Sequence, residues 1–229
     1  MGLLALALAP GIFICLYIYF KDRYKREPLG LLVWAFVLGI LSTVPALIMQ
    51  IAYHKSSLPE GGSVGAVAFF AFCVVGFSEE ISKFLMLRLF LFNRRAFDDP
   101  FDGVVYAVMV GMGFATLENV LYVLQHGMTT GIIRMFLSVP AHGTFAVLMG
   151  YFTGLAKFNP TKRLLYFLLA ILLPILFHGA FDFFLFIRGS GLQIIGALVS
   201  FGLALYFSRR AIKHKQYIAK LHAAENGYQ

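Results

Sequence analysis

The 229-residue sequence is too apolar for a soluble globular domain: 60% of its residues are hydrophobic, 13% are charged, and the mean hydropathy is +0.81. Soluble domains are about 45–50% apolar and about 25% charged, so the composition predicts a protein that crosses a membrane several times and leaves no room for a separate soluble domain. The net charge of +8 indicates basic loops beside anionic lipid rather than nucleic-acid binding.

Apolar stretches of about 20 residues, the length that crosses a bilayer as a helix, recur along the chain. The first, LLALALAPGIFICLYIYF, is followed and not preceded by its basic residues, which indicates a retained helix instead of a cleaved signal peptide. The third is the longest, and we expect it to be tilted or broken. The sequence thus predicts an all-α transmembrane bundle of about seven spans: 3–20, 29–53, 64–92, 101–124, 132–156, 163–187 and 191–208.

Segments rich in Lys and Arg alternate along the chain with segments that carry one or none. The basic segments, with three to five such residues each, are 21–28, 88–100, 157–163 and the stretch from 209. Because Lys and Arg concentrate on the cytoplasmic side, the N-terminus is predicted outside and the C-terminus in the cytoplasm. We divide the chain into one transmembrane domain at 1–208 and a basic cytoplasmic tail at 209–229, expected as a short helix at the inner surface.

Ionisable and amide side chains occur inside these apolar spans, where a charge costs about 2.5–3.5 kcal/mol on insertion scales. They comprise Glu79, Glu80 and Lys83 in the third span, Glu118 and Asn119 in the fourth, His142 in the fifth, and His178 and Asp182 in the sixth. Three glutamates in the hydrocarbon region are too costly to be incidental, and such residues usually mark function. Arg88 and Arg134, by contrast, are expected to snorkel toward or anchor at the membrane interface.

The depths of these residues converge when a rise of about 1.5 Å per residue is applied to the predicted topology. Glu118, His142 and His178 fall roughly 9 to 15 Å below the outer edge of the bilayer, and Glu79 falls roughly 22 Å below it. A kink or short re-entry at Gly76 would bring Glu79 closer. The sequence therefore predicts one polar site in the outer half of the membrane.

Helical spacing suggests how the charges in this site are paired. Glu79 and Lys83 are separated by four residues, which favours their pairing and leaves Glu80 freer to act, although Lys83 is also within i,i+3 reach of Glu80. Two adjacent carboxylates cannot both be ionised at low cost in a low-dielectric site, which suits a general acid or base. His178 and Asp182 have the same spacing, so Asp182 is expected to orient the His178 ring.

Taken in order, these motifs resemble those of the PrsW-type intramembrane proteases. EEISK (79–83) is similar to the family's EExxK motif, FATLE (114–118) to its FxxxE motif, and His142 and HGAFD (178–182) to its histidine motifs. The resemblance extends from about residue 8 to about residue 187, with no departure at a motif position. EExxK alone is a weak signal, whereas four motifs in order on separate spans are a strong one.

The resemblance implies a multi-pass protease of the bacterial plasma membrane that makes the first cut in a single-pass anti-sigma factor. That extracytoplasmic cut starts the proteolysis that frees an extracytoplasmic-function sigma factor. The expected partners are thus this substrate and the lipid bilayer, with no nucleic acid. We expect catalytic residues Glu79, Glu80, Glu118, His142 and His178, supported by Lys83, Asn119 and Asp182.

Peptide hydrolysis at this site requires an activated water, because the sequence offers no Ser/His or Cys/His arrangement as a nucleophile. We expect Glu79 or Glu80 to activate the water. His178 would stabilise the oxyanion or protonate the leaving group, and Glu118 and His142 would hold the water or complete the site.

Metal dependence stays open at this level. HExxH is missing from the sequence, so we favour metal-free activation of water and require no cofactor, with zinc held by Glu118, His142 and His178 as the alternative.

Two other functions use the same residue types. A proton-coupled transporter would need the intramembrane Glu, His and Asp but usually has an inverted repeat, which is not visible here. A non-catalytic membrane scaffold is the third possibility, because a fold does not guarantee catalysis.

Overall fold

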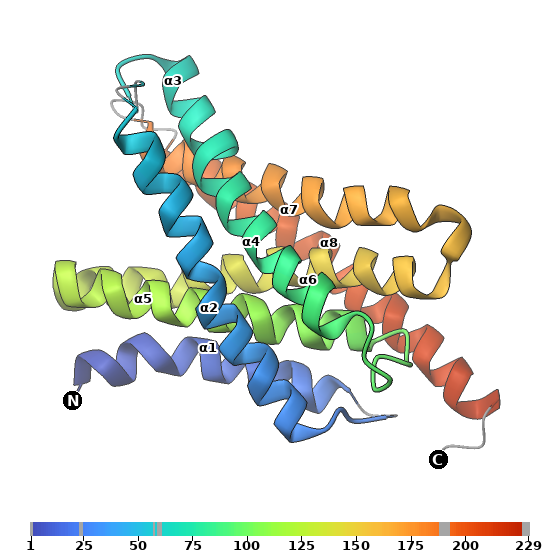
Figure 1. The fold of residues 1–229 in the computed structure, drawn as a ribbon. Coiled ribbons are helices and arrows are strands. Elements are labelled where there is room, and N and C mark those ends of the chain that lie inside the picture. Colours follow the sequence, from blue (N-terminus) through green and yellow to red (C-terminus); the bar gives the residue numbers. More distant parts are fainter. Residues whose placement is uncertain (1, 23–24, 57, 59–60, 188–192, 226–229) are drawn as a thin grey trace.

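The computed structural model describes residues 2–22, 25–56, 58, 61–187 and 193–225, and within these ranges the regular elements are all helices (Figure 1), which confirms the all-α class. The first two are α1 (Gly2–Lys21) and α2 (Leu29–His54). The third span consists of α3 (Val64–Phe69), η1 (Phe70–Gly76), α4 (Phe77–Met86) and η2 (Leu87–Leu91). The remaining helices are α5 (Asp102–Phe136), α6 (Ser138–Phe158), the short η3 (Pro160–Lys162), α7 (Arg163–Phe186) and α8 (Gln193–Glu225).

Six stretches of the described chain are long and apolar enough to cross a membrane, compared with the predicted seven spans. The difference arises from Asp102–Phe158, a stretch of 57 residues that contains both α5 and α6. The number of crossings and the side on which each terminus lies stay predictions.

Residues 125–131, between the predicted spans 101–124 and 132–156, lie within α5, which has a kink in this segment. Gly127 interrupts the helix with φ 78° and ψ −164°, a left-handed conformation that glycine adopts without strain. The chain then continues to Phe136 and turns at Leu137. The kink at Gly127 thus joins two helical parts of α5, and the second part runs back so that Arg134 contacts Glu118.

The third span is one continuous helical stretch that contains two π-helical segments, η1 and η2, on either side of α4. Wide π-helical turns redirect side chains and occur frequently at functional sites. The expected break near Gly76 thus takes the form of a π-helical segment that ends at this residue. Gly76 also lies against α7, since a β-carbon added to it would be 3.3 Å from the backbone nitrogen of Gly179. This contact brings the EEISK segment close to His178.

Helix α5 is the central helix of the bundle, and residues 101–116 are all buried. Figure 1 shows α2 and the third span crossing α5 obliquely, while α1 and α6 run alongside it. Two glycines allow the close approach that this packing needs. A β-carbon on Gly113 would lie 2.0 Å from the carbonyl oxygen of Phe36 in α2, and one on Gly111 would lie 2.6 Å from the β-carbon of Ala146 in α6.

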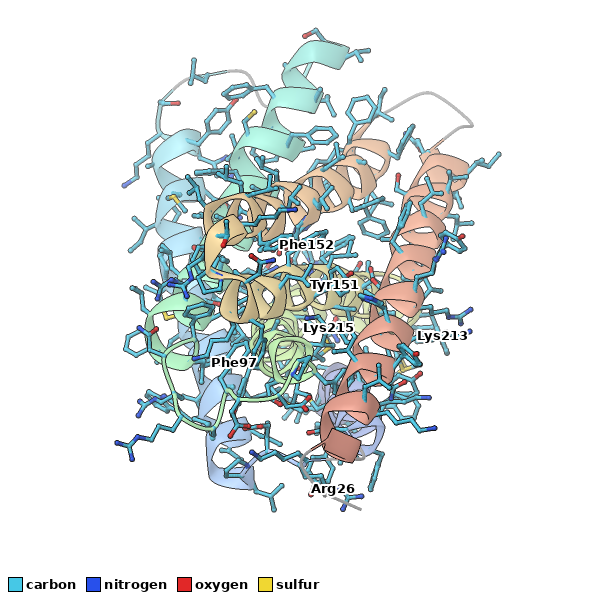
Figure 2. The ribbon with its side chains drawn as sticks, turned by 90° about the vertical axis from the view of Figure 1, so that its right-hand side faces the viewer. Arg26, Phe97, Tyr151, Phe152, Lys213 and Lys215 are labelled. Carbon is cyan, nitrogen blue, oxygen red and sulfur yellow. The ribbon has the colours of Figure 1, made fainter. Side chains whose placement is uncertain are left out.

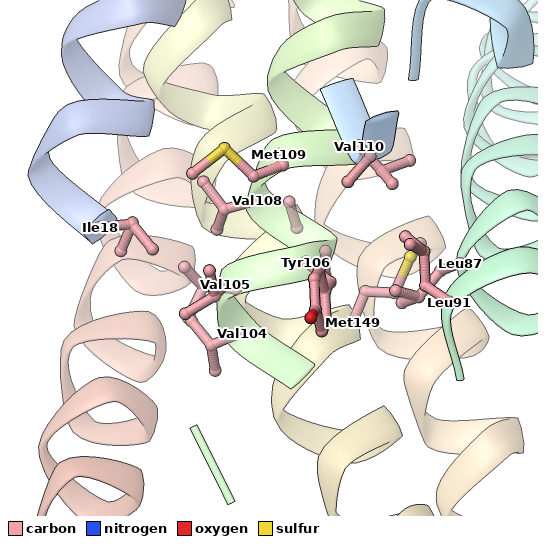
Figure 3. Close-up of a cluster of buried hydrophobic side chains, with 14 of the residues drawn as sticks. Ile18, Leu87, Leu91, Val104, Val105, Tyr106, Val108, Met109, Val110 and Met149 are labelled. Atoms are coloured by element: carbon pink, nitrogen blue, oxygen red, sulfur yellow. The ribbon is translucent and has the colours of Figure 1, made fainter. Parts of the chain in front are cut away.

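The buried core gathers around the first half of α5 (Figure 3), where Val105 and Tyr106 are fully enclosed by side chains from α1, α6 and η2. Large apolar side chains also cover the outer surface of the bundle. Phe13, Ile48 and Leu164 are 69%, 62% and 73% exposed. A soluble monomer rarely exposes so much apolar surface, whereas lipid would cover it.

The basic segments meet at one end of the molecule. Lys25 Nζ lies 2.7 Å from Asp98 Oδ2, which joins the α1–α2 connection to the one between η2 and α5. Lys157 Nζ, at the end of α6, donates to the carbonyl oxygen of Phe92 at 2.6 Å. Three segments predicted to be cytoplasmic therefore lie on the same side of the bundle.

Helix α8 continues without a break past residue 208, so the predicted tail is the last part of this helix where the structure describes it. Gln216 Nε2 donates to the carbonyl oxygen of Lys21 at 2.7 Å, which places this part beside the end of α1. Lys213 is exposed and points away from the bundle, whereas Lys215 is buried and points into it (Figure 2). The lysines of α8 therefore differ in their surroundings.

Candidate active site

The eight polar residues singled out in the sequence form one network of hydrogen bonds and ion pairs, contributed by α4, α5, α6 and α7. Seven of them are buried: Glu79, Glu80, Lys83, Asn119, His142, His178 and Asp182. The eighth, Glu118, has a side chain that is 20% exposed. Tertiary packing thus assembles residues that lie up to 103 positions apart in the sequence.

Lys83 is paired most closely with Glu80. Its Nζ lies 2.6 Å from Glu80 Oε1 and 3.7 Å from Glu79 Oε2, so the spacing-based expectation that Glu79 is the closer partner was wrong. The ammonium group also lies 4.2 Å from the centre of the Phe114 ring and 3.4 Å from His142 Nδ1. These contacts hold the lysine side chain on the Glu80 side, where an i,i+3 pair is as accessible as an i,i+4 pair.

Each of the two adjacent glutamates has one oxygen in a hydrogen bond and one oxygen without a hydrogen bond. Glu80 Oε1 lies 2.8 Å from His178 Nδ1 in addition to its contact with Lys83. Glu79 Oε1 lies 3.4 Å from Gln50 Nε2. Oε2 of each glutamate is buried and has no hydrogen-bond partner in the described part of the chain. Buried acceptors are rarely left in this state, so both oxygens point to a water, an ion or a substrate group.

His178 is held between carboxylates, as expected from its spacing to Asp182. Its Nε2 lies 3.2 Å from Asp182 Oδ2 and 3.9 Å from Glu79 Oε2. The ring stacks on Phe145, with a centroid distance of 5.1 Å and an interplanar angle of 20°. The position and tilt of the imidazole are therefore fixed by both hydrogen bonds and packing.

His142 is oriented by groups on its two sides. Its Nε2 lies 3.0 Å from Glu118 Oε2, and its Nδ1 lies 3.4 Å from Lys83 Nζ. A carboxylate only accepts hydrogen bonds and an ammonium group only donates them. The neutral imidazole with its hydrogen on Nε2 and its lone pair on Nδ1 satisfies both contacts.

Sequence reasoning missed Arg134, which was expected to anchor at the membrane interface. Its Nη2 lies 2.7 Å from Glu118 Oε2, and its Nε donates to Asn119 Oδ1 at 3.1 Å. The signal in the sequence was an arginine just inside an apolar stretch, which by itself does not distinguish an interfacial anchor from a residue of the site.

Three side chains from different helices lie close enough together that they could hold a metal ion. Ligand atoms of Glu79, His142 and His178 lie within 4.8 Å of one another, the one such group among the described residues. The set predicted from the sequence contained Glu118 in place of Glu79. Glu118 Oε2 is shared between Arg134 and His142, whereas Glu79 Oε2 has no hydrogen-bond partner among the described residues, so the geometry favours Glu79 over Glu118 as the carboxylate ligand. Two imidazoles and one carboxylate are the protein ligands of several hydrolytic zinc sites.

The charge balance is also compatible with a metal ion. The network contains four carboxylates, from Glu79, Glu80, Glu118 and Asp182, but two basic side chains other than histidine, Lys83 and Arg134. Two negative charges remain to be balanced by histidine protonation or by a divalent cation. The excess negative charge and the Glu79 oxygen without a hydrogen bond are compatible with a divalent metal ion, which His178 would bind through a nitrogen that gives up its hydrogen and one of its two carboxylate contacts.

The fold and the site together define a multi-pass membrane protein with a buried glutamate–histidine centre suited to the activation of water. Residues 27–209 match the profile of a family described as PrsW family intramembrane metalloprotease. The chain belongs to this family and is a peptidase, which confirms the resemblance seen in the sequence.

Relatives named Protease PrsW match most of the chain. The protein of Geobacillus kaustophilus is 38% identical over 184 residues, which cover 80% of this chain and 80% of the relative. That of Bacillus subtilis is 36% identical over 185 residues, or 80% and 83% of the two chains. That of Clostridioides difficile is 37% identical over 194 residues, or 82% and 81%. No solved structure matches the chain.

Proposed function

We propose that this peptidase makes the first cut in a single-pass anti-sigma factor in the bacterial plasma membrane, and so starts the release of an extracytoplasmic-function sigma factor. Membership of the PrsW family and the similarity at the EExxK, FxxxE and histidine motifs support this assignment. The observation that carries the catalytic part is the convergence of Glu79, Glu80, His142 and His178 in one buried centre.

The site lies far from the basic end of the bundle. His178 is 15 residues from Arg163 along α7, or about 22 Å at 1.5 Å per residue. Glu118 is 16 residues from Asp102 along α5, or about 24 Å. If the basic end faces the cytoplasm, a hydrocarbon core of about 30 Å puts the site in the outer half of the membrane. A cut in the extracytoplasmic juxtamembrane part of a substrate needs a site at this depth.

We also propose that Glu79, His142 and His178 hold a divalent metal of the zinc class. Such an ion, when bound, would act as a Lewis acid toward water or the scissile carbonyl group. The description of the family as metalloproteases supports this proposal, as do the free Glu79 oxygen and the excess negative charge. It takes the place of the metal-free site that the sequence favoured.

Glu80 has the geometry of a general base. Lys83 and His178 both contact its Oε1, which fixes the carboxylate and leaves Oε2 free to accept a proton. Glu80 would take a proton from the attacking water and return it to the leaving amine, the exchange that a single carboxyl group can perform. Asp182 would keep the His178 ring in place, and Glu118 would do the same for His142.

The test is cleavage of a purified anti-sigma factor from the same bacterium by the full chain in lipid nanodiscs. Glu80→Gln keeps the shape of the side chain and removes the base, so turnover should fall by about 10²–10⁴-fold. His178→Ala should abolish measurable cleavage. Glu27→Gln is the matched control, because Glu27 is equally buried but belongs to the α1–α2 connection, and it should retain activity.

Two results would decide against these assignments. Full activity of Glu80→Gln would show that Glu80 is not the base. Undiminished activity after treatment with a strong chelator, together with the absence of metal in active protein, would overturn the metal site but not the assignment of the substrate.

A further inference from the structure

Arg134 contacts Glu118 of the site although the two residues lie far apart along one helix. It follows Glu118 by 16 residues on the same helix, α5. Along a straight helix this separation corresponds to about 24 Å, far beyond the reach of an arginine side chain. The contact of 2.7 Å between Arg134 Nη2 and Glu118 Oε2 exists because Gly127, with φ 78°, turns the end of α5 back on itself.

The surroundings of the guanidinium group form a built site. Its Nε donates to Asn119 Oδ1 at 3.1 Å, and its carbon lies 4.0 Å from the centre of the Tyr122 ring. Asn119 is fully buried and donates through Nδ2 to the carbonyl oxygen of Ala7 in α1 at 3.0 Å. The returning segment is itself packed, since a β-carbon on Gly131 would lie 2.6 Å from Leu6 Cδ2. The arginine is thus held on three sides.

Glu118 Oε2 connects this arrangement to the histidine. The same oxygen accepts from Arg134 Nη2 and lies 3.0 Å from His142 Nε2. Arg134 therefore helps to hold the carboxylate in place, and the carboxylate, together with Lys83 beside Nδ1, favours the hydrogen of His142 on Nε2. The carboxyl groups behind metal-binding or catalytic histidines orient the ring and fix its tautomer.

We propose that Arg134 is a positioning residue of this peptidase, which acts through Glu118 to keep His142 in the tautomer that directs its Nδ1 lone pair toward the site. The inference rests on the proposed role of His142 and does not depend on the identity of the substrate. It also explains the role of Gly127, because the change of chain direction at this residue places Arg134 beside Glu118.

Arginine is suited to this role because its planar fork donates to two acceptors at once, here Glu118 and Asn119. Lysine has the same charge, but it is concentrated on one ammonium group, which cannot reproduce the contacts with both Glu118 and Asn119. Arg88 is the matched control, since it is another partly buried arginine of the same bundle and lies over the rings of Phe92 and Phe167, at 4.7 and 5.2 Å.

The first readout needs no substrate and no metal. Full-length protein with ¹⁵N-labelled histidine is placed in nanodiscs after removal of metal, and the His142 ring signals are assigned by their loss in His142→Gln. Wild type and Arg88→Ala should show the hydrogen on Nε2. Arg134→Ala should show a mixture with the Nδ1–H tautomer. An unchanged tautomer in Arg134→Ala would overturn the proposal.

The second readout is peptide cleavage. Arg134→Ala should lower kcat by about 10–100-fold, the usual effect of losing an outer contact of a metal-site histidine, with KM little changed. Added guanidinium ion should restore part of the activity of Arg134→Ala and none of that of Glu80→Gln. Arg88→Ala should behave as wild type. A wild-type kcat in Arg134→Ala, or a lowered kcat that guanidinium does not restore at all, would contradict the proposal.

A folding control keeps the two readouts interpretable. If Arg134→Ala is not recovered as monodisperse protein, Arg134→Lys decides the question, because it retains the charge and most of the packing. A mixed tautomer and a lowered kcat in Arg134→Lys support the proposal, and a wild-type tautomer and kcat overturn it. If wild type cleaves no anti-sigma factor, the proposed function fails while the tautomer measurement still tests Arg134.

Discussion

Replacing Lys83 with methionine removes the cation that lies beside two buried glutamates. The side chains of Lys83, Glu79 and Glu80 are 3%, 5% and 0% exposed, so water cannot take over the role of the ammonium group. Methionine has a similar length and fills most of the same volume. The change therefore tests the charge and not a cavity.

The expected loss of stability follows from this burial. Removing one partner of a buried ion pair costs about 3–5 kcal/mol, because it leaves an uncompensated charge in a low-dielectric interior. Lys83 contacts Glu80 at 2.6 Å and Glu79 at 3.7 Å, so we expect Lys83→Met to cost an amount within this range. For a chain of this size, about 2–4 °C of melting temperature per kcal/mol converts the loss to roughly 6–20 °C.

A second substitution separates charge imbalance from general damage. Lys83→Met combined with Glu80→Gln removes both members of the closer pair and leaves no charge without its partner in that pair. The double variant should recover more than half of the lost stability, because replacing both partners of a buried pair is often close to neutral. Lys213→Met, at an exposed position of α8, is the control and should change stability by less than about 0.5 kcal/mol.

The assay is the temperature at which half of the detergent-solubilised protein is lost from the monodisperse peak in fluorescence-detected size-exclusion chromatography. If Lys83→Met melted within 2 °C of wild type, the ammonium group would not be the main counter-charge of the glutamates. A double variant less stable than Lys83→Met would refute the reasoning in the same way.

Three further predictions follow from the structure. Glu79→Gln should weaken zinc binding, whereas Glu80→Gln should keep zinc and lose turnover. Competition with a chromophoric chelator measures the zinc affinity. Equal weakening in both variants would contradict the assignment of Glu79 as metal ligand and Glu80 as general base. Gly113→Val should cost at least about 1–3 kcal/mol by overpacking, since its β-carbon would lie 2.0 Å from a carbonyl oxygen of α2; a wild-type melting temperature would contradict this packing. Burial raises the pKa values of Asp22 and Glu27, in the α1–α2 connection, to about 7. The folded protein keeps these protons up to about pH 7 and the unfolded chain releases them near pH 4, so their contribution to stability is complete below about pH 4 and is lost as the pH rises through 7. Asp22→Asn should therefore flatten the fall in melting temperature between pH 5 and 8, and an unchanged slope would count against the raised pKa.

The sequence by itself determined the class of the protein, the approximate helices and the polar residues of the site. Apolar runs of spanning length are unambiguous, and α1, α2 and α7 begin and end within about two residues of the predicted spans. An ionisable residue is costly in such a run, so Glu79, Glu118 and His178 stand out without any structure. Their order along the chain was enough to indicate the family.

Only the tertiary structure decided how these residues are connected. Spacing could not choose between Glu79 and Glu80 as the partner of Lys83, because i,i+3 and i,i+4 positions are both within reach on one helix. The grouping of Glu79, instead of Glu118, with His142 and His178 depends on how α4 and α5 are rotated about their axes, which no local pattern encodes. The role of Arg134 depends on the bend at Gly127, since one left-handed glycine brings together two residues that a straight helix would hold about 24 Å apart.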